Sequence, residues 1–333
     1  MIEDTRGQDR TLVAIVVTYN RLEKLQSTIG RLLDASDAVL QRVLVIDNAS
    51  TDGTAAWLAQ QIDPRLTVYS NQTNTGGAGG FALGIDLATR LFDPDWLVVM
   101  DDDARPAPGA LEAFSAMNVD AHDAVAAAVY YPDGKICEMN RPSRNPFQSA
   151  RLFLRSLFMG RNGFHISHDA YNGGGQHVDV TSFVGFFVSR AGVEKAGLPD
   201  ASLFVYGDDG IYTLGLSQKG GRIWFAPSLR FEHDCATIQN KRFFPMWKVY
   251  YYHRNLLIMY RQAAGWLFWP ACLLILPRWI LSARHHKEDR DVFWKLMSRA
   301  IRDGVSRKTN VPHADILDIC ALQTAAQVEN ARG

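Results

Sequence analysis

Three consecutive aspartates, Asp101, Asp102 and Asp103, follow the apolar run WLVVM at residues 96–100. Adjacent carboxylates repel one another, and a bound divalent cation offsets that repulsion. In an extended segment, side chains at the first and third positions point the same way. Asp101 and Asp103 are therefore predicted to share a cation, while Asp102 faces elsewhere. A solvated acidic turn is the alternative, although turns rarely carry three aspartates at the end of such a strand.

A single histidine, His233, follows an apparent strand in the segment RFEHDCAT. Its neutral imidazole is an available ligand for an ion of the Mn²⁺ or Mg²⁺ type. A lone histidine more often has a structural role. The aspartate run favours the ligand interpretation, so His233 is predicted to complete the cation site with Asp101 and Asp103.

A second carboxylate pair, Asp208 and Asp209, occurs in FVYGDDGIYTLG, between an aromatic segment and an apparent helix start. Two neighbouring carboxylates push one pKa upward, which suits a general base that must deprotonate a hydroxyl group. Capping of the helix N-terminus is the competing interpretation, and it explains one of the two aspartates.

Polar residues also end two earlier apolar runs. Asp47 ends VLVID, and Thr18 and Asn20 follow the run before it. Ligands of open α/β sheets bind at the carboxyl ends of the strands, so these side chains are candidates for recognising a nucleotide base. A plain turn with a helix cap over residues 47–53 is the alternative. The same segment lacks the spacing and the final glutamate of a calcium loop.

A glycine-rich segment, NTGGAGGF at residues 74–81, precedes a predicted helix. Glycines such as Gly76 and Gly77 let the backbone approach a phosphate, and a helix N-terminus favours anions. A cofactor-like G-x-G-x-x-A pattern can be drawn here, but it follows the third strand rather than the first, so the match is weak. A flexible loop without a ligand is the alternative.

The elements that must position these residues alternate between strands and helices, which is the rhythm of an α/β fold with a parallel sheet. Apolar runs rich in valine and isoleucine predict the strands, and helical spacing of apolar residues predicts the helices. The expected strands are 12–17, 43–46, 66–69 and 96–100, and the expected helices are 21–33, 54–61 and 81–92.

Beyond Asp103 the pattern changes to longer strands, which indicates a mixed sheet. These strands are expected at 124–131, 178–189 and 222–231. From residue 246 onward, apolar residues recur at helical spacing and predict a helical appendage. Its aromatic run, WKVYYYH, is followed by Arg254 and Asn255, and we expect this segment to pack in a core or to border the acceptor.

Composition limits the possible partners. Lys+Arg and Asp+Glu are equal at 35 each among 333 residues, so no overall basic field would recruit nucleic acid. The chain is long and apolar enough for one large core with an appendage. Its four cysteines are widely spaced and match no zinc pattern, which predicts buried thiols in a reducing cytosol: Cys137, Cys235, Cys272 and Cys320.

The first ten residues are polar and charged and lack the apolar run of a signal peptide, so a cytoplasmic protein is expected. The stretch WLFWPACLLILPRWI at 266–280 is shorter than a spanning helix needs and contains Pro270 and Pro277. It is predicted to be interfacial or buried. Its tryptophans and the basic RHHK that follows predict peripheral contact with the inner face of the cytoplasmic membrane.

Taken in order, these motifs resemble glycosyltransferase family 2, whose members have the GT-A fold and use inverting chemistry. The resemblance covers roughly residues 11–262. It rests on VAIVVTYNR, VLVIDNASTDGT, NTGGAGGFALG, VVMDDDARP, FVYGDDGIY, EHD and MWKVYYYHRN. Within the family, the chain is most similar to bacterial galactofuranosyltransferases, and next to rhamnosyltransferases.

The resemblance implies roles for the residues above. Asp101, Asp103 and His233 would hold Mn²⁺ or Mg²⁺, Asp47 would face uracil, and Asp209 would be the general base. The family commonly places another acidic residue two positions after the aspartate pair, where this chain has Ile211, so Asp208 remains the alternative base. Further donor contacts are expected from Thr18, Asn20, Arg21, Asn74, Gly76, Gly77, Asp101 and Asp102.

The implied enzyme moves a sugar from a nucleotide donor, with a UDP-sugar favoured over a dTDP-sugar, to a hydroxyl of a glycan or lipid-linked acceptor. Its catalytic domain would span 1–245, with a donor half at about 11–105 and an acceptor half at about 106–245, and a helical region would span 246–333. A single displacement needs one base, unlike the two carboxylates of glycosidases.

Other functions remain open at this point. A rhamnosyltransferase would use dTDP-rhamnose. A nucleotidyltransferase would usually carry its glycine-rich loop after the first strand, where this chain has VTYNRLEKL. A non-catalytic nucleotide-sugar-binding module would need neither Asp209 nor His233.

Overall fold

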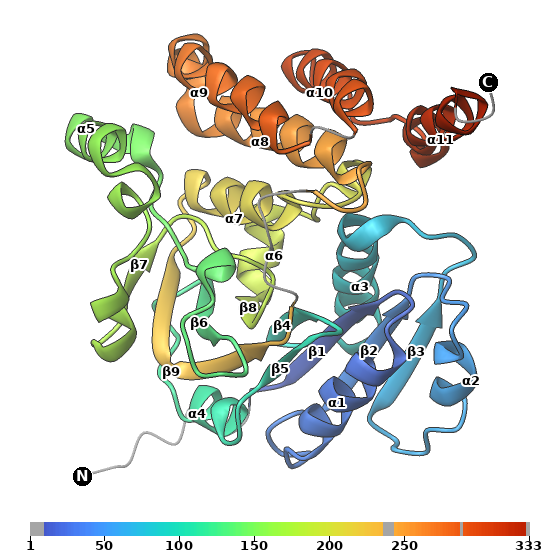
Figure 1. Ribbon diagram of the computed structural model, residues 1–333. Coiled ribbons are helices and arrows are strands. Elements are labelled where there is room, and N and C mark those ends of the chain that lie inside the picture. Colours follow the sequence, from blue (N-terminus) through green and yellow to red (C-terminus); the bar gives the residue numbers. More distant parts are fainter. Residues whose placement is uncertain (1–9, 236–242, 287–288, 331–333) are drawn as a thin grey trace. The chain divides into compact units, whose positions relative to one another are not determined.

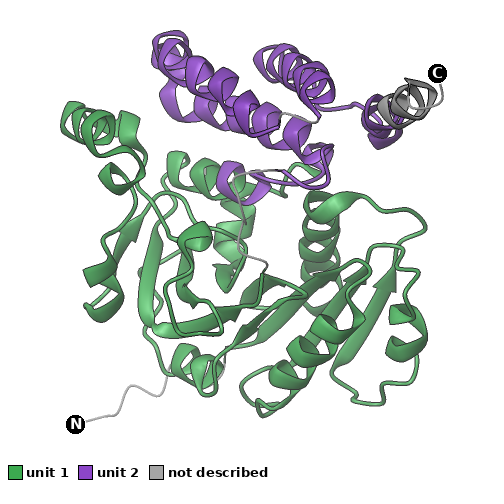
Figure 2. Cartoon of the chain, viewed as in Figure 1, with its two compact units in different colours: residues 1–201, 212–235 green, residues 202–211, 236–333 purple. Residues whose placement is uncertain are grey.

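The computed structural model describes residues 10–235, 243–286 and 289–330, which form two compact units (Figures 1 and 2). The first unit comprises Met1–Ala201 and Tyr212–Cys235, and the second comprises Ser202–Ile211 and Ala236–Gly333. The boundary therefore falls within one helix, α7 (Asp208–Gln218). The division at residue 245 that the sequence suggests stays a prediction.

The first unit is built on one mixed sheet of nine strands in the described part of the chain. The strand order is β3-β2-β1-β4-β8-β6-β9-β5, with β7 beside β9. Neighbours among the first four strands in this order pair in parallel, β8 is antiparallel to both β4 and β6, and β6 and β9 are again parallel. The strands are β1 (Leu12–Thr18), β2 (Arg42–Asp47), β3 (Leu66–Ser70), β4 (Trp96–Asp101), β5 (Ala104–Pro106), β6 (Ala124–Tyr130), β7 (Gln176–Val178), β8 (Phe186–Ser189) and β9 (Ile223–His233).

Helices cover both faces of this sheet (Figure 1), which explains why β1 is apolar along its length rather than alternating. On one face, Leu25 and Ile29 join the core, and on the other, Phe81 and Ile85 do so. Besides α7, the helices whose residues lie in the first unit are α1 (Leu22–Leu33), α2 (Thr54–Leu58), α3 (Gly76–Phe92), α4 (Ala110–Ser115), α5 (Ala150–Met159) and α6 (Arg190–Ala196).

The glycine-rich segment is largely helical, which corrects the prediction that α3 begins near Phe81. The helix begins at Gly76, so GGAGG forms its first turns. A Cβ atom at Gly80 would lie 2.4 Å from a methyl carbon of Val17, and one at Gly84 would lie 2.5 Å from a methyl carbon of Ile15. These two glycines therefore allow α3 to pack closely on β1; the segment from Gly76 is a helix rather than a loop, and its contact with a phosphate stays a prediction.

The strand expected at 178–189 is interrupted, which is a second correction. It divides into β7 and β8, which pair with different neighbours. Gly185 lies between them with φ of +64°, and a Cβ there would approach the Phe231 ring to 2.7 Å and the Ala127 Cβ to 2.8 Å. A left-handed backbone conformation and a crowded core both require glycine at this position, and they end the regular strand.

The second unit is helical, as the apolar spacing predicts. Its core contains the buried residues Val249, Tyr250, Phe293 and Leu296. By length and composition alone, one helical stretch, Lys248–His285, is long and apolar enough to cross a membrane. Gly265 interrupts the α-helical geometry within it. The helices are α8 (Lys248–Ala264), α9 (Phe268–Ser282), α10 (Arg290–Val305) and α11 (His313–Asn330).

Candidate active site

The three adjacent aspartates occupy a turn at the carboxyl end of β4. Asp101 is the last residue of β4, and the chain re-enters the sheet as β5 at Ala104. The hydroxyl of Thr28 in α1 donates to the carbonyl oxygens of Asp102 and Ala104, at 2.7 and 3.0 Å. Helix α1 therefore fixes the backbone of this turn.

Strand pairing brings His233 to this turn from a distant part of the sequence. In the β5–β9 pair, Ala104 lies opposite His233. The Nε2 atom of His233 lies 3.2 Å from Asp103 Oδ1, and one ligand atom each from Asp101, Asp103 and His233 lies within 4.8 Å of the others. Two carboxylate oxygens and one imidazole nitrogen form a donor set that suits Mn²⁺ or Mg²⁺.

Asp102 faces a different set of partners, as the alternation of side chains predicts. It accepts hydrogen bonds from the Thr18 hydroxyl at 2.8 Å and from the backbone amide of Tyr19 at 3.3 Å. The Arg21 guanidinium lies 3.2 Å from Asp102 and 2.6 Å from Asp103. Thr18 is itself buried, so its side chain supports the aspartate turn, and its contact with a donor stays a prediction.

Burial and the mutual repulsion of the carboxylates shift the pKa values of the cluster upward, and Arg21 and His233 oppose this. Burial, and then the charge of Asp103, raise the pKa of Asp101 to about 7, and burial raises the pKa of Asp102 to about 6. Burial alone would lower the pKa of His233, but its hydrogen bonds to Asp103 and Cys137 raise it to about 10. Burial would also raise the pKa of Asp103, yet His233 and Arg21 lower it below its usual value.

The opposite nitrogen of His233 has its own buried partners. Nδ1 lies 2.7 Å from Asn140 Oδ1, and the Asn140 amide donates to the Ser182 hydroxyl at 2.8 Å. A proton on Nδ1 leaves the Nε2 lone pair directed at the aspartates, which is the tautomer that a metal at Nε2 requires. Asn140 ends the short 3₁₀ turn Glu138–Asn140.

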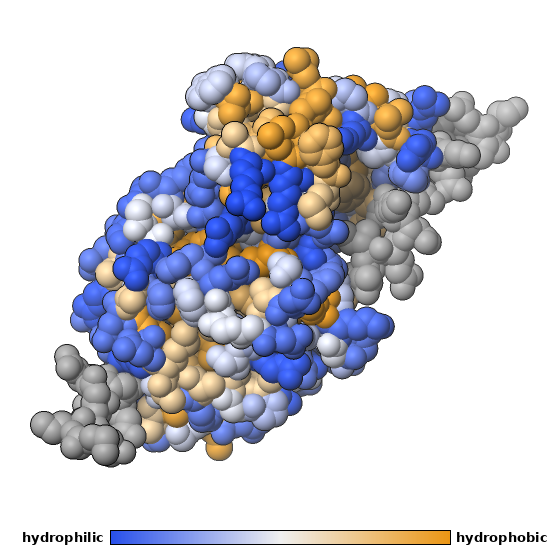
Figure 3. Space-filling view, turned by 90° about the vertical axis from the view of Figure 1, so that its left-hand side faces the viewer, coloured by the Kyte–Doolittle hydropathy of each residue, from blue (hydrophilic) through white to orange (hydrophobic). Residues whose placement is uncertain are grey.

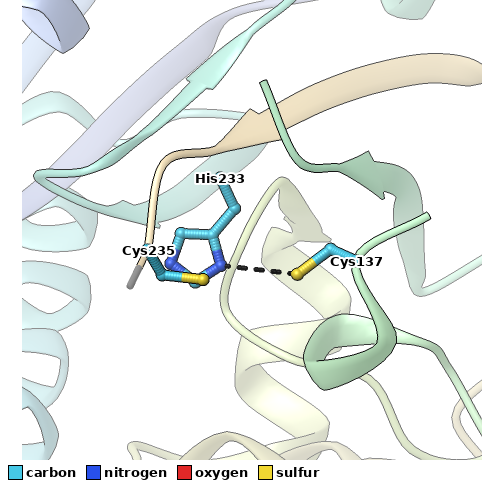
Figure 4. A group of neighbouring side chains, drawn as sticks. All are labelled: Cys137, His233 and Cys235. Carbon is cyan, nitrogen blue, oxygen red and sulfur yellow. Dashed lines mark hydrogen bonds between the residues drawn. The ribbon is translucent and has the colours of Figure 1, made fainter. Parts of the chain in front are cut away.

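Two thiols lie close to the His233 ring, and Figure 4 shows the contact between Cys137 and a ring nitrogen. Cys137 Sγ is 4.0 Å from Nδ1. With Cys235, these residues form a group of three possible metal ligands. The hydrogen bond with Cys235, and then that with His233, lower the pKa of Cys137 to about 4, although burial opposes this. The contact with Cys137, reinforced by burial, raises the pKa of Cys235.

Polar loops at the ends of β1 and β2 are tied together. The side-chain oxygen of Asn20 accepts a hydrogen bond from the backbone N–H of Thr51 at 2.6 Å, and the backbone N–H of Asn20 donates to the Ser50 hydroxyl at 3.0 Å. Asp47 is buried and accepts from the Ser50 amide at 2.9 Å. Asp47 and Asn20 thus meet through one loop at the strand ends, where a base was predicted to bind.

The start of α3 is held by two asparagines. Asn74 Oδ1 accepts the Gly76 amide at 2.8 Å. Asn48, which is buried at the end of β2, donates to the Gly76 carbonyl at 2.7 Å and accepts from the Thr75 hydroxyl at 3.0 Å. Gly77 is the next residue of the helix. This arrangement places the amino end of α3 at the same sheet edge as Asp47.

Asp208 and Asp209 begin α7, in the part of that helix assigned to the second unit. Asp208 is buried, and Asp209 is partly exposed, with its Oδ1 2.6 Å from the Gly210 amide. The loop before them is strained, because Phe204 and Tyr206 both have φ of +67°.

Two buried side chains of α8 hold this loop in place. The amide nitrogen of Asn255 lies 3.0, 2.9 and 2.7 Å from the carbonyl oxygens of Leu203, Val205 and Tyr206. Arg254 donates to the Leu203 carbonyl at 2.8 Å. Arg254 and Asn255 therefore define the path of the chain into Asp208.

Three asparagines hold these segments: sequence reasoning missed Asn48 and Asn140, and it named Asn255 only as part of a segment that packs in a core or borders the acceptor. Asn48 follows Asp47 in the DNAS segment, so its place at a strand end was visible. Asn140 lies in a loop-rich insert with no motif, and Asn255 follows an aromatic run that suggests core packing. Their importance depends on which distant carbonyl, amide or imidazole each one meets.

Comparison with known proteins agrees with the resemblance found in the sequence. A family model described as glycosyl transferase family 2 matches residues 13–186. Galactofuranosyltransferase GlfT1 of Mycolicibacterium smegmatis is 28% identical over 230 residues, which cover 68% of this chain and 72% of that protein. This relative agrees with the galactofuranosyltransferase resemblance of the motifs.

Solved structures show the same fold. Mannosyltransferase PcManGT from Pyrobaculum calidifontis, in complex with GDP-Man and Mn²⁺, aligns with a TM-score of 0.52 and 17% identity over 94% of this chain and 80% of its own. GalNAc-T7 with UDP, GalNAc and Mn²⁺ aligns with a TM-score of 0.54 and 12% identity over 75% of this chain and 47% of its own. The predicted GT-A fold is thereby confirmed.

Proposed function

The chain belongs to glycosyl transferase family 2, and from that premise we propose an inverting, metal-dependent enzyme that transfers galactofuranose from UDP-galactofuranose. The acceptor is a hydroxyl of a cell-surface glycan or of a lipid-linked oligosaccharide. The similarity to a mycobacterial-type galactofuranosyltransferase supports this choice of sugar. The observation that carries the proposal is the convergence of Asp101, Asp103 and His233 at the carboxyl edge of the sheet.

The donor atoms of this cluster fit a divalent cation. Two carboxylate oxygens beside an imidazole suit Mn²⁺ or Mg²⁺, and the pKa of Asp101 is raised by its burial and by the neighbouring carboxylate of Asp103. When bound, such an ion neutralises charge on the diphosphate leaving group. Asp101, Asp103 and His233 hold it, and Asn140 orients the imidazole so that Nε2 is free to ligate.

The nucleotide of the donor is bound along the polar strand ends. Asp47 contacts the uracil, with Thr18 at the end of β1 and Asn20 in the loop that follows. Arg21 and Asp102 lie along the donor, and their ion pair fixes the guanidinium next to the cation site. At the amino end of α3, the residues that approach the diphosphate are Asn74, Gly76 and Gly77.

Proton removal from the acceptor is assigned to Asp209. Its carboxylate takes the hydroxyl proton as the acceptor oxygen attacks the anomeric carbon from the face opposite the leaving diphosphate, so the stereocentre inverts. Its place at the start of α7 and its partial exposure support this role. Asp208 is buried and is the second candidate for the base.

Calorimetric titration of UDP and of dTDP, each with Mn²⁺ and with a chelator, tests the donor and the metal together. We expect UDP to bind in a Mn²⁺-dependent manner and more tightly than dTDP. Asp103→Asn should abolish the Mn²⁺ dependence, whereas Asp86→Asn, in an exposed ion pair on α3, should not. Preference for dTDP would redirect the assignment to rhamnosyl transfer, and metal-independent binding would contradict the cation site.

The reaction product tests the choice of sugar and the inversion of configuration. Incubation with UDP-galactofuranose and a hydroxyl acceptor should give a glycoside of inverted anomeric configuration by NMR, and chelation should stop the reaction. A product with retained configuration would overturn the single-displacement mechanism.

Contact with a membrane surface forms part of the proposal. Around α9, apolar side chains are exposed, and Figure 3 shows a hydrophobic patch at the top of the molecule, where Figure 1 places α9. Aromatic and aliphatic side chains next to basic residues suit an anionic bilayer surface. The exposed apolar residues here are Trp266, Trp269, Leu273, Leu274, Ile280 and Leu281.

Flotation with anionic liposomes tests this contact. The wild-type protein should co-float, and Trp266→Ser combined with Leu273→Ser should reduce co-flotation. Leu91→Ser, which changes an exposed apolar residue of α3, provides the control. Wild-type protein that stays at the bottom of the gradient would refute the proposal.

A further inference from the structure

The two thiols beside His233 have no part in the chemistry proposed above. One ligand atom each from Cys137, His233 and Cys235 lies within 4.8 Å of the others, and Cys137 Sγ lies 4.0 Å from His233 Nδ1 (Figure 4). Cys137 and His233 are buried, and Cys235 is partly buried. The sequence predicts ordinary buried thiols here, because residues 137 and 235 are far apart and neither belongs to a CxxC pair.

We propose that Cys137, Cys235 and His233 Nδ1 form a second cation site, selective for a thiophilic divalent ion of the zinc class. Two sulfur atoms and one imidazole nitrogen are ligands that zinc prefers, whereas Mn²⁺ and Mg²⁺ prefer oxygen-rich sites. Thiolates and a deprotonated Nδ1 are the ligating species, so binding releases to solvent the protons that Cys235 and His233 carry.

The geometry needs small adjustments to accept the ion. Ligand atoms about 2.0–2.3 Å from a tetrahedral zinc lie roughly 3.5 Å from one another. The observed separation of 4.0 Å between Cys137 Sγ and Nδ1 is close to that value. Asn140 Oδ1 lies 2.9 Å from Cys137 Sγ and 2.7 Å from Nδ1, so it offers an oxygen as a fourth ligand.

The shared histidine makes the two cation sites antagonistic, an inference that rests on the proposed function. A neutral imidazole has one lone pair. With the proton on Nδ1, the ring donates to Asn140 and its lone pair at Nε2 serves the aspartate site. With the proton on Nε2, the ring donates to Asp103 and its lone pair at Nδ1 serves the thiols. A thiophilic ion therefore withdraws His233 from the aspartate site.

Titration with Co²⁺ alone tests the thiol site without reference to activity. Wild-type protein should develop thiolate-to-cobalt charge-transfer absorption, and Asp103→Asn should retain it. The double variant Cys137→Ser/Cys235→Ser should lose the band. Cys272→Ser, which changes a buried thiol of the second unit, should keep it. No band in the wild-type protein, or an unchanged band in the double variant, would overturn the proposal.

Competition with Mn²⁺ tests the antagonism. Free Mn²⁺, measured by electron paramagnetic resonance, should show that one equivalent of Zn²⁺ weakens Mn²⁺ binding by roughly tenfold in the wild-type protein. The double serine variant should bind Mn²⁺ normally with or without Zn²⁺. Equal Zn²⁺ inhibition in both proteins would contradict the shared-histidine mechanism. A cobalt band without any Mn²⁺ binding would leave the thiol site standing and would instead refute the proposed aspartate site.

Discussion

The aspartates of the β4 turn and those that begin α7 are held in opposite ways. Around Asp102 and Asp103, the partners are side chains: Thr18, Arg21 and His233 contact the carboxylates directly. Before Asp208, Asn255 of α8 binds backbone carbonyls of the strained loop. The first arrangement tunes charge, and the second fixes position.

This contrast teaches that similar aspartate clusters can serve different steps. Changes near the β4 turn should alter metal affinity, and changes near the start of α7 should alter turnover at saturating metal and donor. The predictions below test whether the two effects separate.

The largest effect is expected from Asp209→Asn. Loss of the base should reduce kcat by about 10²–10⁴-fold, while Mn²⁺-dependent UDP binding stays within about twofold of the wild-type value. Single-turnover kinetics and calorimetry measure the two quantities. If Asp208→Asn loses turnover and Asp209→Asn does not, the base is Asp208.

Asn255→Leu should lower kcat next most strongly. The change removes the donor for three carbonyls, lets the loop at 203–206 relax and misplaces the carboxylate, at a cost of roughly 10²-fold. Mn²⁺ affinity should not change. Tyr250 lies in α8 with Asn255, and its hydroxyl donates a buried hydrogen bond to Asp303. Tyr250→Phe, which removes that bond, should lower stability but not kcat.

If Asn255→Leu and Tyr250→Phe both weaken Mn²⁺ binding in proportion to their loss of kcat, the second unit acts through stability rather than by positioning the base. Circular dichroism at the assay temperature establishes that each variant is folded.

Asn140→Leu should lower Mn²⁺ affinity and leave kcat at saturating Mn²⁺ unchanged. Without the acceptor at Nδ1, the imidazole loses its preferred tautomer and orientation, and Mn²⁺ affinity should fall by about 10–100-fold. Saturating Mn²⁺ should restore kcat. Asn140→Gln, which keeps the amide, should recover part of the affinity, and a loss of kcat that excess metal does not restore would contradict the orienting role.

The smallest effect is expected from pH. Protons compete with the cation for Asp101, whose pKa is raised to about 7, and for His233, whose pKa is raised to about 10. Raising the pH from about 6 to 8 should therefore tighten Mn²⁺ binding by at least about tenfold, with proton release. Calorimetry in buffers of different ionisation enthalpy measures that release, and binding that is independent of pH would contradict it.

Local sequence determined much of the first unit. Apolar runs at β1, β2 and β4 identified buried parallel strands, and the polar residues that follow them predicted which edge of the sheet binds the donor. Alternation of side chains also separated Asp102 from Asp101 and Asp103. These features depend on neighbouring residues, whose periodicity is visible in a single sequence.

Tertiary structure decided which distant residues meet. The β5–β9 register brought His233 to Asp103, and the fold of the 3₁₀ turn brought Asn140 and Cys137 to the other side of the same ring. Packing against β1, rather than loop flexibility, required glycine at Gly80 and Gly84. A single sequence carries no periodic pattern for contacts between residues a hundred positions apart, because such contacts arise only when strands and helices pack.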